Sequence, residues 1–208
     1  MIIFSCSDYF ILSNSLYNKR ITNAREKITM QATTRKTTVW LCTTAMLMAL
    51  NIALSSFGVP VPGGHLYLND IVICAAALLL DPVGAFLVGG VGAFLGDLFF
   101  YPTPMFVSLV THGLQAVVIS LCCRHLFRSS GKELAAAVIG VLLGAVIMVV
   151  GYSLGRAFIY STPEYALLKL PFQILQAVVG AVAGILLCFP CGIRRVFRKM
   201  GFQRASAA

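Results

Sequence analysis

Three stretches of the sequence place hydrogen-bonding side chains at helical spacing within apolar surroundings. They are Ser108, His112 and Gln115; Tyr152, Arg156 and Tyr160; and Lys169, Gln173 and Gln176. Residues three or four positions apart share one face of a helix. Amide, imidazole, guanidinium and ammonium groups bind polar edges of a ligand, and tyrosine rings pack on its ring system. The three stripes therefore indicate a pocket for a polar small molecule.

Three members of these stripes also have a purely structural explanation. Arg156 can form an ion pair with Asp97 or Glu164. Lys169 can extend to the membrane surface, and His112 can satisfy a hydrogen bond between helices. The sequence leaves these alternatives open for each residue taken alone, and the common depth of the three stripes is the stronger observation.

The acidic residues do not form a catalytic pattern. Asp70, which follows Asn69, and Asp97 are the acids close to apolar interiors, and we expect them to bind or to pair. The sequence has no phosphate-binding loop, no zinc-protease or serine-hydrolase motif and no paired carboxylates of the glycosidase type. Cys188-Phe-Pro-Cys191 lacks the second ligand pair of a zinc site and is expected to pack at a helix end. We therefore expect no enzymatic activity, no cofactor and no metal.

The composition is that of a membrane protein. Of the 208 residues, 59% are hydrophobic and only 11% are charged, against about 25% charged in soluble domains. The net charge of +9 arises from cations gathered at the ends of apolar runs, which favours a role in membrane topology over binding of nucleic acid.

The apolar runs predict an all-α protein of six transmembrane helices. The predicted spans are residues 38–57, 69–81, 83–100, 105–123, 134–160 and 166–190. The second is short, and Asp81-Pro82 is predicted to end it. Residues 58–68 are predicted to form a Pro/Gly loop, and the Pro-containing turn from Tyr101 a tight connection.

The cations predict the orientation of these spans. Arg35 and Lys36 precede the first span, Arg124, Arg128 and Lys132 follow the fourth, and an Arg-rich tail follows the sixth. With six spans all three groups lie on one side, which the positive-inside rule makes cytoplasmic. Both termini are then cytoplasmic, the polar stripes lie in the outer half of a plasma membrane, and the inner half is apolar.

The chain is expected to have three parts. Residues 1–35 form a polar extension, 36–193 the membrane domain and 194–208 a basic cytoplasmic tail. Translation from Met1 or from Met30 remains open. A stripe of small residues on the first span, Ala45, Ala49 and Ala53, allows close approach of another helix, either a partner subunit or a helix of the same chain.

Several segments together resemble a known family. They are Gly64-His-Leu-Tyr-Leu-Asn-Asp70, the Gly-rich run 75–104 that ends in Asp97 and a Tyr-Pro turn, the Gly151-Tyr152 pair, Leu170-Pro171-Phe-Gln173-Ile-Leu-Gln176 and the alanine stripe. Over about residues 40–190 the chain resembles the substrate-binding S components of energy-coupling factor (ECF) vitamin transporters.

The resemblance implies a bacterial plasma-membrane protein that binds a water-soluble vitamin outside the cell. A membrane scaffold subunit and two cytoplasmic ATPases would drive uptake, the alanine stripe would face the scaffold, and the loop 58–69 would gate the pocket. Residues of the last three helices would hold the ligand. Arg156 and Lys169 depart from the family pattern, as does Phe172-Gln173, and the two cations favour an anionic or carbonyl-rich ligand.

Pyridoxine-, hydroxymethylpyrimidine-, pantothenate- and riboflavin-like ligands all remain open. Two other functions compete with this interpretation. A stand-alone secondary transporter or channel would need a continuous polar path, and a lipid-modifying enzyme would need a catalytic group near the cytoplasmic side. The apolar inner halves of the spans favour neither.

Overall fold

The computed structural model describes residues 30, 33–34, 36–62, 64–126 and 132–199. The chain divides into two compact units, Met1–Leu41 and Cys42–Ala208, and the second contains all the predicted site residues. Most of the predicted extension 1–35, the end of the predicted tail after residue 199, and Arg128 lie outside the described residues.

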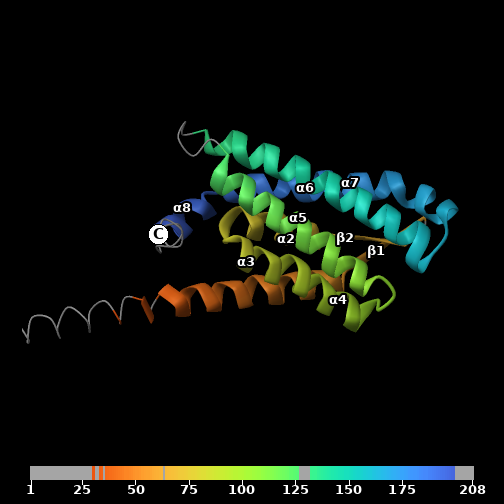
Figure 1. The fold of residues 1–208 in the computed structure, drawn as a ribbon, viewed down its shortest axis with the longest axis horizontal. Coiled ribbons are helices and arrows are strands. Elements are labelled where there is room, and N and C mark those ends of the chain that lie inside the picture. The colour runs from red at the N-terminus through yellow and green to blue at the C-terminus, as the bar shows by residue number, and fades with distance from the viewer. Residues whose placement is uncertain (1–29, 31–32, 35, 63, 127–131, 200–208) are drawn as a thin grey trace, which may run out of the picture. The chain divides into compact units, whose positions relative to one another are not determined.

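The described part of the chain is mainly helical (Figure 1). After a first helix, Lys36–Ser55, come α2 (Asn69–Leu79), α3 (Pro82–Phe86), η1 (Leu87–Val91), α4 (Gly92–Phe100), α5 (Met105–His125), α6 (Glu133–Gly155), η2 (Arg156–Tyr160), α7 (Pro163–Cys188) and α8 (Ile193–Lys199). The segments η1 and η2 are single π-helical turns that continue their neighbours into Pro82–Phe100 and Glu133–Tyr160.

Five of these helical segments are long and apolar enough to cross a membrane. They correspond to five of the predicted spans, and their ends differ from the predicted ends by a few residues. The sixth predicted span, 69–81, is the shorter helix α2 of 11 residues. It ends as predicted, because Leu80 is extended and Pro82 opens α3. The chain is therefore a multi-pass membrane protein, and the six-span count is left as a prediction.

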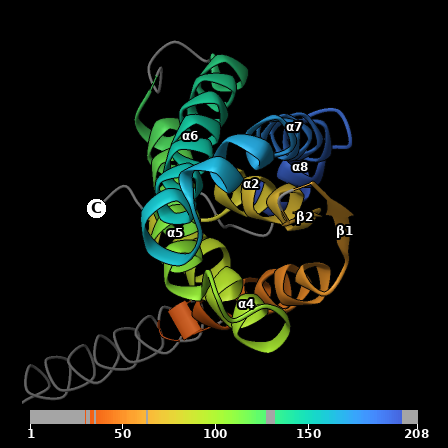
Figure 2. The same cartoon turned by 90° about the vertical axis from the view of Figure 1, so that its right-hand side faces the viewer.

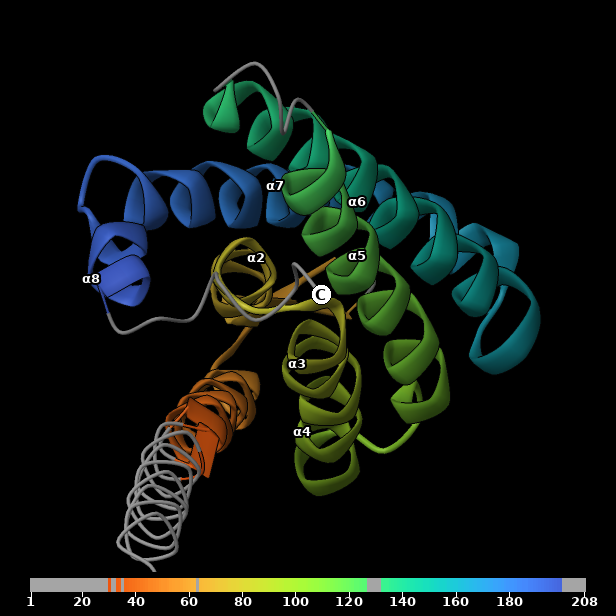
Figure 3. The ribbon, with the colours of Figure 1, turned by 60° about the vertical axis from the view of Figure 1, so that its left-hand side comes forward.

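Helix α2 occupies the centre of the bundle (Figure 3). Ile73, Ala76 and Leu80 are at most 1% exposed, because helices rather than lipid surround them. Gly180 of α7 makes this packing close, since a Cβ there would lie 2.6 Å from the Cβ of Asp70. The close contact fixes the start of α2, and with it Asn69 and Asp70, against α7.

Residues 58–61 and 64–67, which lie in the segment predicted as a loop, form the two strands of a β-hairpin (Figure 2). Strand β1 (Gly58–Val61) pairs antiparallel with β2 (Gly64–Tyr67), with Gly58 opposite Tyr67. Two paired strands satisfy each other's backbone groups, which a glycine- and proline-rich composition does not reveal. In Figure 1 the hairpin lies at the same end of the bundle as the connections after α4 and η2.

The first helix turns a polar face inward from residue 44 onward. Thr44, Asn51 and Ser55 are buried, and the Asn51 amide donates a 2.6 Å hydrogen bond to the carbonyl of Val88 in η1. In a π-helical turn some carbonyls lose their regular backbone partner, and Asn51 supplies one from the neighbouring helix. The alanine stripe lies on the other side of this helix, where Ala45, Ala49 and Ala53 are exposed.

The opposite end of the bundle has its own polar contact. Arg194 of α8 is buried, lies 3.7 Å from a carboxylate oxygen of Glu133, and covers the ring of Phe189 at 5.0 Å. Residue 194, at which the basic tail is predicted to begin, lies in α8, and the boundary between membrane domain and tail stays a prediction.

Candidate functional site

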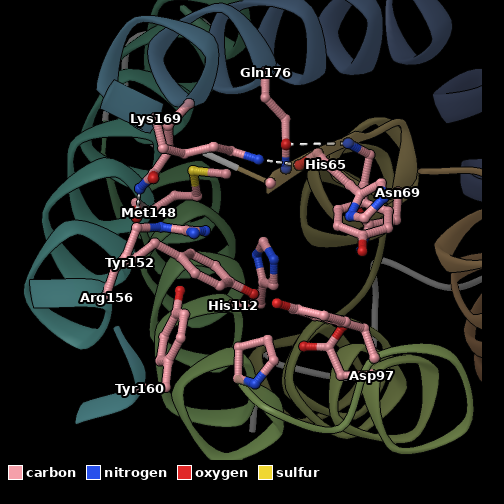
Figure 4. Close-up of a pocket in the computed structure, with 15 residues that line it drawn as sticks. His65, Asn69, Asp97, His112, Met148, Tyr152, Arg156, Tyr160, Lys169 and Gln176 are labelled. Carbon is pink, nitrogen blue, oxygen red and sulfur yellow. Dashed lines mark hydrogen bonds between the residues drawn. The ribbon is translucent and has the colours of Figure 1, made fainter. Parts of the chain in front are cut away.

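A cavity of about 540 Å³, its open mouth included, lies at the end of the bundle that carries the hairpin. The hairpin, the start of α2, the end of α4, and α5, α6, η2 and α7 all contribute side chains to it (Figure 4). The walls combine four tyrosines with amides, imidazoles, a carboxylate and two cations. The lining residues are Gly64, His65, Tyr67, Asn69, Asp97, Tyr101, Pro104, His112, Met148, Tyr152, Arg156, Tyr160, Lys169, Gln173 and Gln176.

Most of the predicted binding residues are brought together in this cavity. Those that line it are Asn69, Asp97, His112, Tyr152, Arg156, Tyr160, Lys169, Gln173 and Gln176. Asp70 and Gln115 are absent from the lining and are each 1% exposed. The structure therefore gives these two residues a supporting position behind the wall.

The buried carboxylate of Asp70 is held by two amides. Gln176 donates to one oxygen at 2.6 Å, and Gln115 donates to the other at 3.2 Å. His112 lies 3.7 Å from the same carboxylate, and its Nδ1 is 2.7 Å from the amide oxygen of Gln115. Because the Gln115 nitrogen is directed at Asp70, His112 Nδ1 is the donor in this contact. A neutral His112 then offers Nε2 as an acceptor.

A second chain of hydrogen bonds runs along the cavity wall. Tyr152 donates to Ser108 at 2.5 Å, and Ser108 donates to the Asp97 carboxylate. The rings of Tyr152 and His112 meet edge to face at 5.1 Å. The two chains of hydrogen bonds thus meet at this ring contact, which joins α2, α4, α5, α6 and α7 around the cavity.

The π-helical turn η2 carries Arg156 and Tyr160. The guanidinium of Arg156 lies 5.3 Å from the centre of the Tyr160 ring, a cation–π distance. The Tyr160 hydroxyl is buried and has no hydrogen-bond partner among the described residues. Buried hydroxyls are nearly always paired, so this group is available to a ligand.

Lys169 is buried and does not extend to the membrane surface. It is 4% exposed and donates a hydrogen bond to the carbonyl of His65 in the hairpin. Gln173, one turn further along α7, donates to the carbonyl of Val149 at 2.9 Å and so binds α7 to α6. The same polar stripe therefore holds the hairpin at one end and a neighbouring helix at the other.

Gly64 begins β2 and brings the hairpin backbone close to both cations. Its φ of +145° lies in a region that favours glycine. The point where a Cβ would stand is 3.5 Å from Arg156 Nη1 and 3.5 Å from Lys169 Nζ. A side chain at this position would therefore point at both cationic groups and be in van der Waals contact with them.

The hairpin contributes three lining residues that the sequence analysis did not name as binding residues, namely Gly64, His65 and Tyr67. The family resemblance implied only a gating loop in this segment. The hairpin is held in place at Tyr67, because the Tyr67 backbone N–H donates to Gln176 at 3.1 Å. His65, Tyr101 and Met148 had no periodic signal, because they enter the cavity from a strand, from a turn and from an apolar helix face, respectively.

Among the described residues no three His, Cys, Asp or Glu side chains gather as metal ligands. Of the two cysteines in the C-x-x-C segment, Cys188 is buried and Cys191 is exposed, and neither forms a disulfide. Cys188 lies 3.7 Å from the carbonyl of Ala75. This cysteine packs α7 on α2, as the sequence predicted for a helix end.

Comparison with known proteins places these features in a family. Residues 35–191 match the family described as "ECF-type riboflavin transporter, S component". A protein of Pyrococcus woesei, described as "Uncharacterized protein in gap 3'region", is 31% identical over 128 residues, which cover 61% of this chain and 82% of that protein. With the family match spanning the cavity and the apolar helices, the chain belongs to the S components of ECF-type riboflavin transporters and is a substrate-binding transport component of the vitamin type, not an enzyme.

Proposed function

We propose that this protein captures a water-soluble vitamin or vitamin precursor outside the cell and delivers it through an ATP-driven ECF importer. The observation that carries this proposal is the convergence of polar side chains from the hairpin and the surrounding helices on one cavity. Polar groups within a membrane protein are costly unless they serve a partner, a cavity or a ligand. The buried hydroxyl of Tyr160, which has no hydrogen-bond partner in the part of the chain that the structure describes, supports a ligand in particular.

The ligand is a compact molecule with a ring and several polar substituents. Tyr152 and Tyr160 offer ring faces and edges. His112 offers an acceptor nitrogen, Asn69 an amide, and Asp97 an acceptor for a hydroxyl or amine of the ligand. Riboflavin, which the family description names, is one candidate, and pyridoxine-, hydroxymethylpyrimidine- and pantothenate-like molecules share the required features.

The cavity faces the outside of a bacterial plasma membrane. Helix α2 and the hairpin together make the sixth crossing, since the hairpin lengthens a helix that is short by itself. Both termini then lie in the cytoplasm, on the side of the Arg and Lys clusters. Asn69, Asp70, Asp97 and the three polar stripes fall in the outer half of the membrane under this arrangement.

Energy for uptake comes from partner subunits. The sequence has no phosphate-binding loop of its own, so a membrane scaffold and two cytoplasmic ATPases supply ATP hydrolysis. The scaffold docks on Ala45, Ala49 and Ala53. These small residues are exposed, and a stripe of small residues permits close helix packing in membranes.

Purification from native membranes tests this function. The chain, tagged at its C-terminus and extracted in mild detergent, should bring with it one membrane protein and two ATPases, and ATP should drive vitamin uptake into vesicles only when all four are present. Uptake by the chain alone, in liposomes without ATP, would instead establish a secondary transporter.

A further inference from the structure

The two cations of the cavity converge on one point of the hairpin. Apart from atoms of Gly64 and its two neighbours in the chain, the three heavy atoms nearest to a Cβ built on Gly64 are all nitrogens of the two cations. They are Arg156 Nη1 at 3.5 Å, Lys169 Nζ at 3.5 Å and Arg156 Nη2 at 3.8 Å. Arg156 Nη1 and Lys169 Nζ, each 3.5 Å from this point, are therefore separated by at most twice that 3.5 Å distance. Two like charges this close, in surroundings shielded from water, repel each other.

The protein's own contacts do not neutralise this pair on the Lys169 side. Lys169 donates to a backbone carbonyl, that of His65, and forms no ion pair with a carboxylate among the described residues. The carboxylate that lines the cavity, Asp97, lies across it from Lys169 (Figure 4) and accepts a hydrogen bond from Ser108. The cavity is thus polarised, with two cations on one side and an anion on the other.

We infer that the ligand carries an oxyanion, either a carboxylate or a phosphate ester, which binds at Gly64 between Arg156 and Lys169. This inference rests on the proposed function and specifies the class of its substrate. Because Gly64 has no side chain, a ligand oxygen can come into van der Waals contact with its Cα on the side that faces Arg156 and Lys169, where both groups can donate charge-assisted hydrogen bonds to it. The opposite end of the ligand carries a hydrogen-bond donor that faces Asp97.

Matched pairs of vitamins that differ in one charge provide the test. The purified chain in nanodiscs is titrated with nicotinate and nicotinamide, with pantothenate and panthenol, with pyridoxal 5′-phosphate and pyridoxal, and with riboflavin 5′-phosphate and riboflavin. In at least one pair the anionic member should bind about ten-fold tighter or more. The first two pairs report on a carboxylate and the last two on a phosphate.

Variants localise the preference. Lys169→Gln and Arg156→Gln should each bring the ratio of the two affinities close to one, and Arg156→Lys, which keeps the charge, should retain part of it. Arg195→Gln removes a guanidinium from an exposed position on α8 and should leave the ratio unchanged. Asp97→Asn should weaken both members of a pair by a similar factor, because the anion lies on the other side of the cavity.

The inference is overturned if the neutral members bind as tightly as the anionic ones, if no anionic member binds, or if the preference survives in both pocket variants. If a neutral vitamin binds tightly and ATP-dependent uptake is observed, the ligand has no oxyanion and the proposed function still holds. If no ATPases co-purify with the chain and no ATP-dependent uptake is observed, the proposed function itself is wrong.

Discussion

Gln176 donates a 2.6 Å hydrogen bond to Asp70, a carboxylate that is 1% exposed. The oxygen of the same amide accepts the backbone N–H of Tyr67 at 3.1 Å. One side chain of α7 thereby joins the last residue of the hairpin to the first turn of the central helix α2. The position of the hairpin over the cavity thus depends on a buried polar contact, in addition to apolar packing.

Replacing Gln176 with alanine should destabilise the protein by about 1–3 kcal/mol, because a buried carboxylate loses a donor and the hairpin loses its anchor. Unfolding in nanodiscs, followed by circular dichroism against temperature, measures this change. Leu175→Ala, at the adjacent exposed position, is the control and should unfold much like the wild type. Equal stability of the two variants would mean that Gln176 does not support the hairpin.

Two tyrosines that differ in their partners should respond differently to removal of the hydroxyl. Tyr152→Phe loses the bond to Ser108 and should cost about 1 kcal/mol of stability. Tyr160→Phe removes a hydroxyl that has no partner among the described residues, so stability should be unchanged while vitamin affinity falls about ten-fold. Thermal unfolding without ligand and calorimetric titration with it separate the two effects. Unchanged affinity in Tyr160→Phe would exclude this hydroxyl from the site.

The sequence predicted the helices well because hydropathy reports the solvent around a segment, and lipid demands long apolar runs. Helical spacing also predicted that Tyr152, Arg156 and Tyr160 would share a face, although the last two lie in a π-helical turn. The hydrogen-bond partners were beyond this reasoning. Asn51 bonds to Val88, and Arg194 pairs with Glu133, only because distant helices dock at those positions.

The separation between lining and supporting residues likewise required the fold. Asp70 and Gln115 have the same polarity and spacing signals as the residues of the cavity wall, yet they lie behind it. The hairpin was hidden for another reason: its glycines and prolines are typical of irregular loops, and only its pairing along β1 and β2 gives it regular structure.

Ala49→Trp should abolish uptake and leave vitamin binding unchanged, because the indole would block close approach of the scaffold at an exposed position distant in sequence from the cavity residues. Leu50→Trp, at an exposed position roughly 100° further around the helix, should retain uptake. ATP-dependent uptake and equilibrium binding are measured on the same preparations. Normal uptake by Ala49→Trp would show that the partner docks elsewhere.

The proposed topology predicts opposite accessibility of two cysteines. A membrane-impermeant maleimide applied to intact cells should label Val59→Cys in the hairpin, at a position that is 52% exposed. The native Cys191, exposed in the turn between α7 and α8, should be labelled only in inside-out vesicles. Labelling of Cys191 from outside would invert the orientation and leave the cavity facing the cytoplasm.

Native mass spectrometry of the purified chain tests the central claim most directly. The wild type and the exposed-surface control Arg195→Ala should carry a vitamin-sized ligand, which Arg156→Ala should have lost. A chain that carries only lipid after growth with a full vitamin supply, or an Arg156→Ala variant that retains the vitamin at wild-type occupancy, would contradict the assignment of this cavity as the binding site.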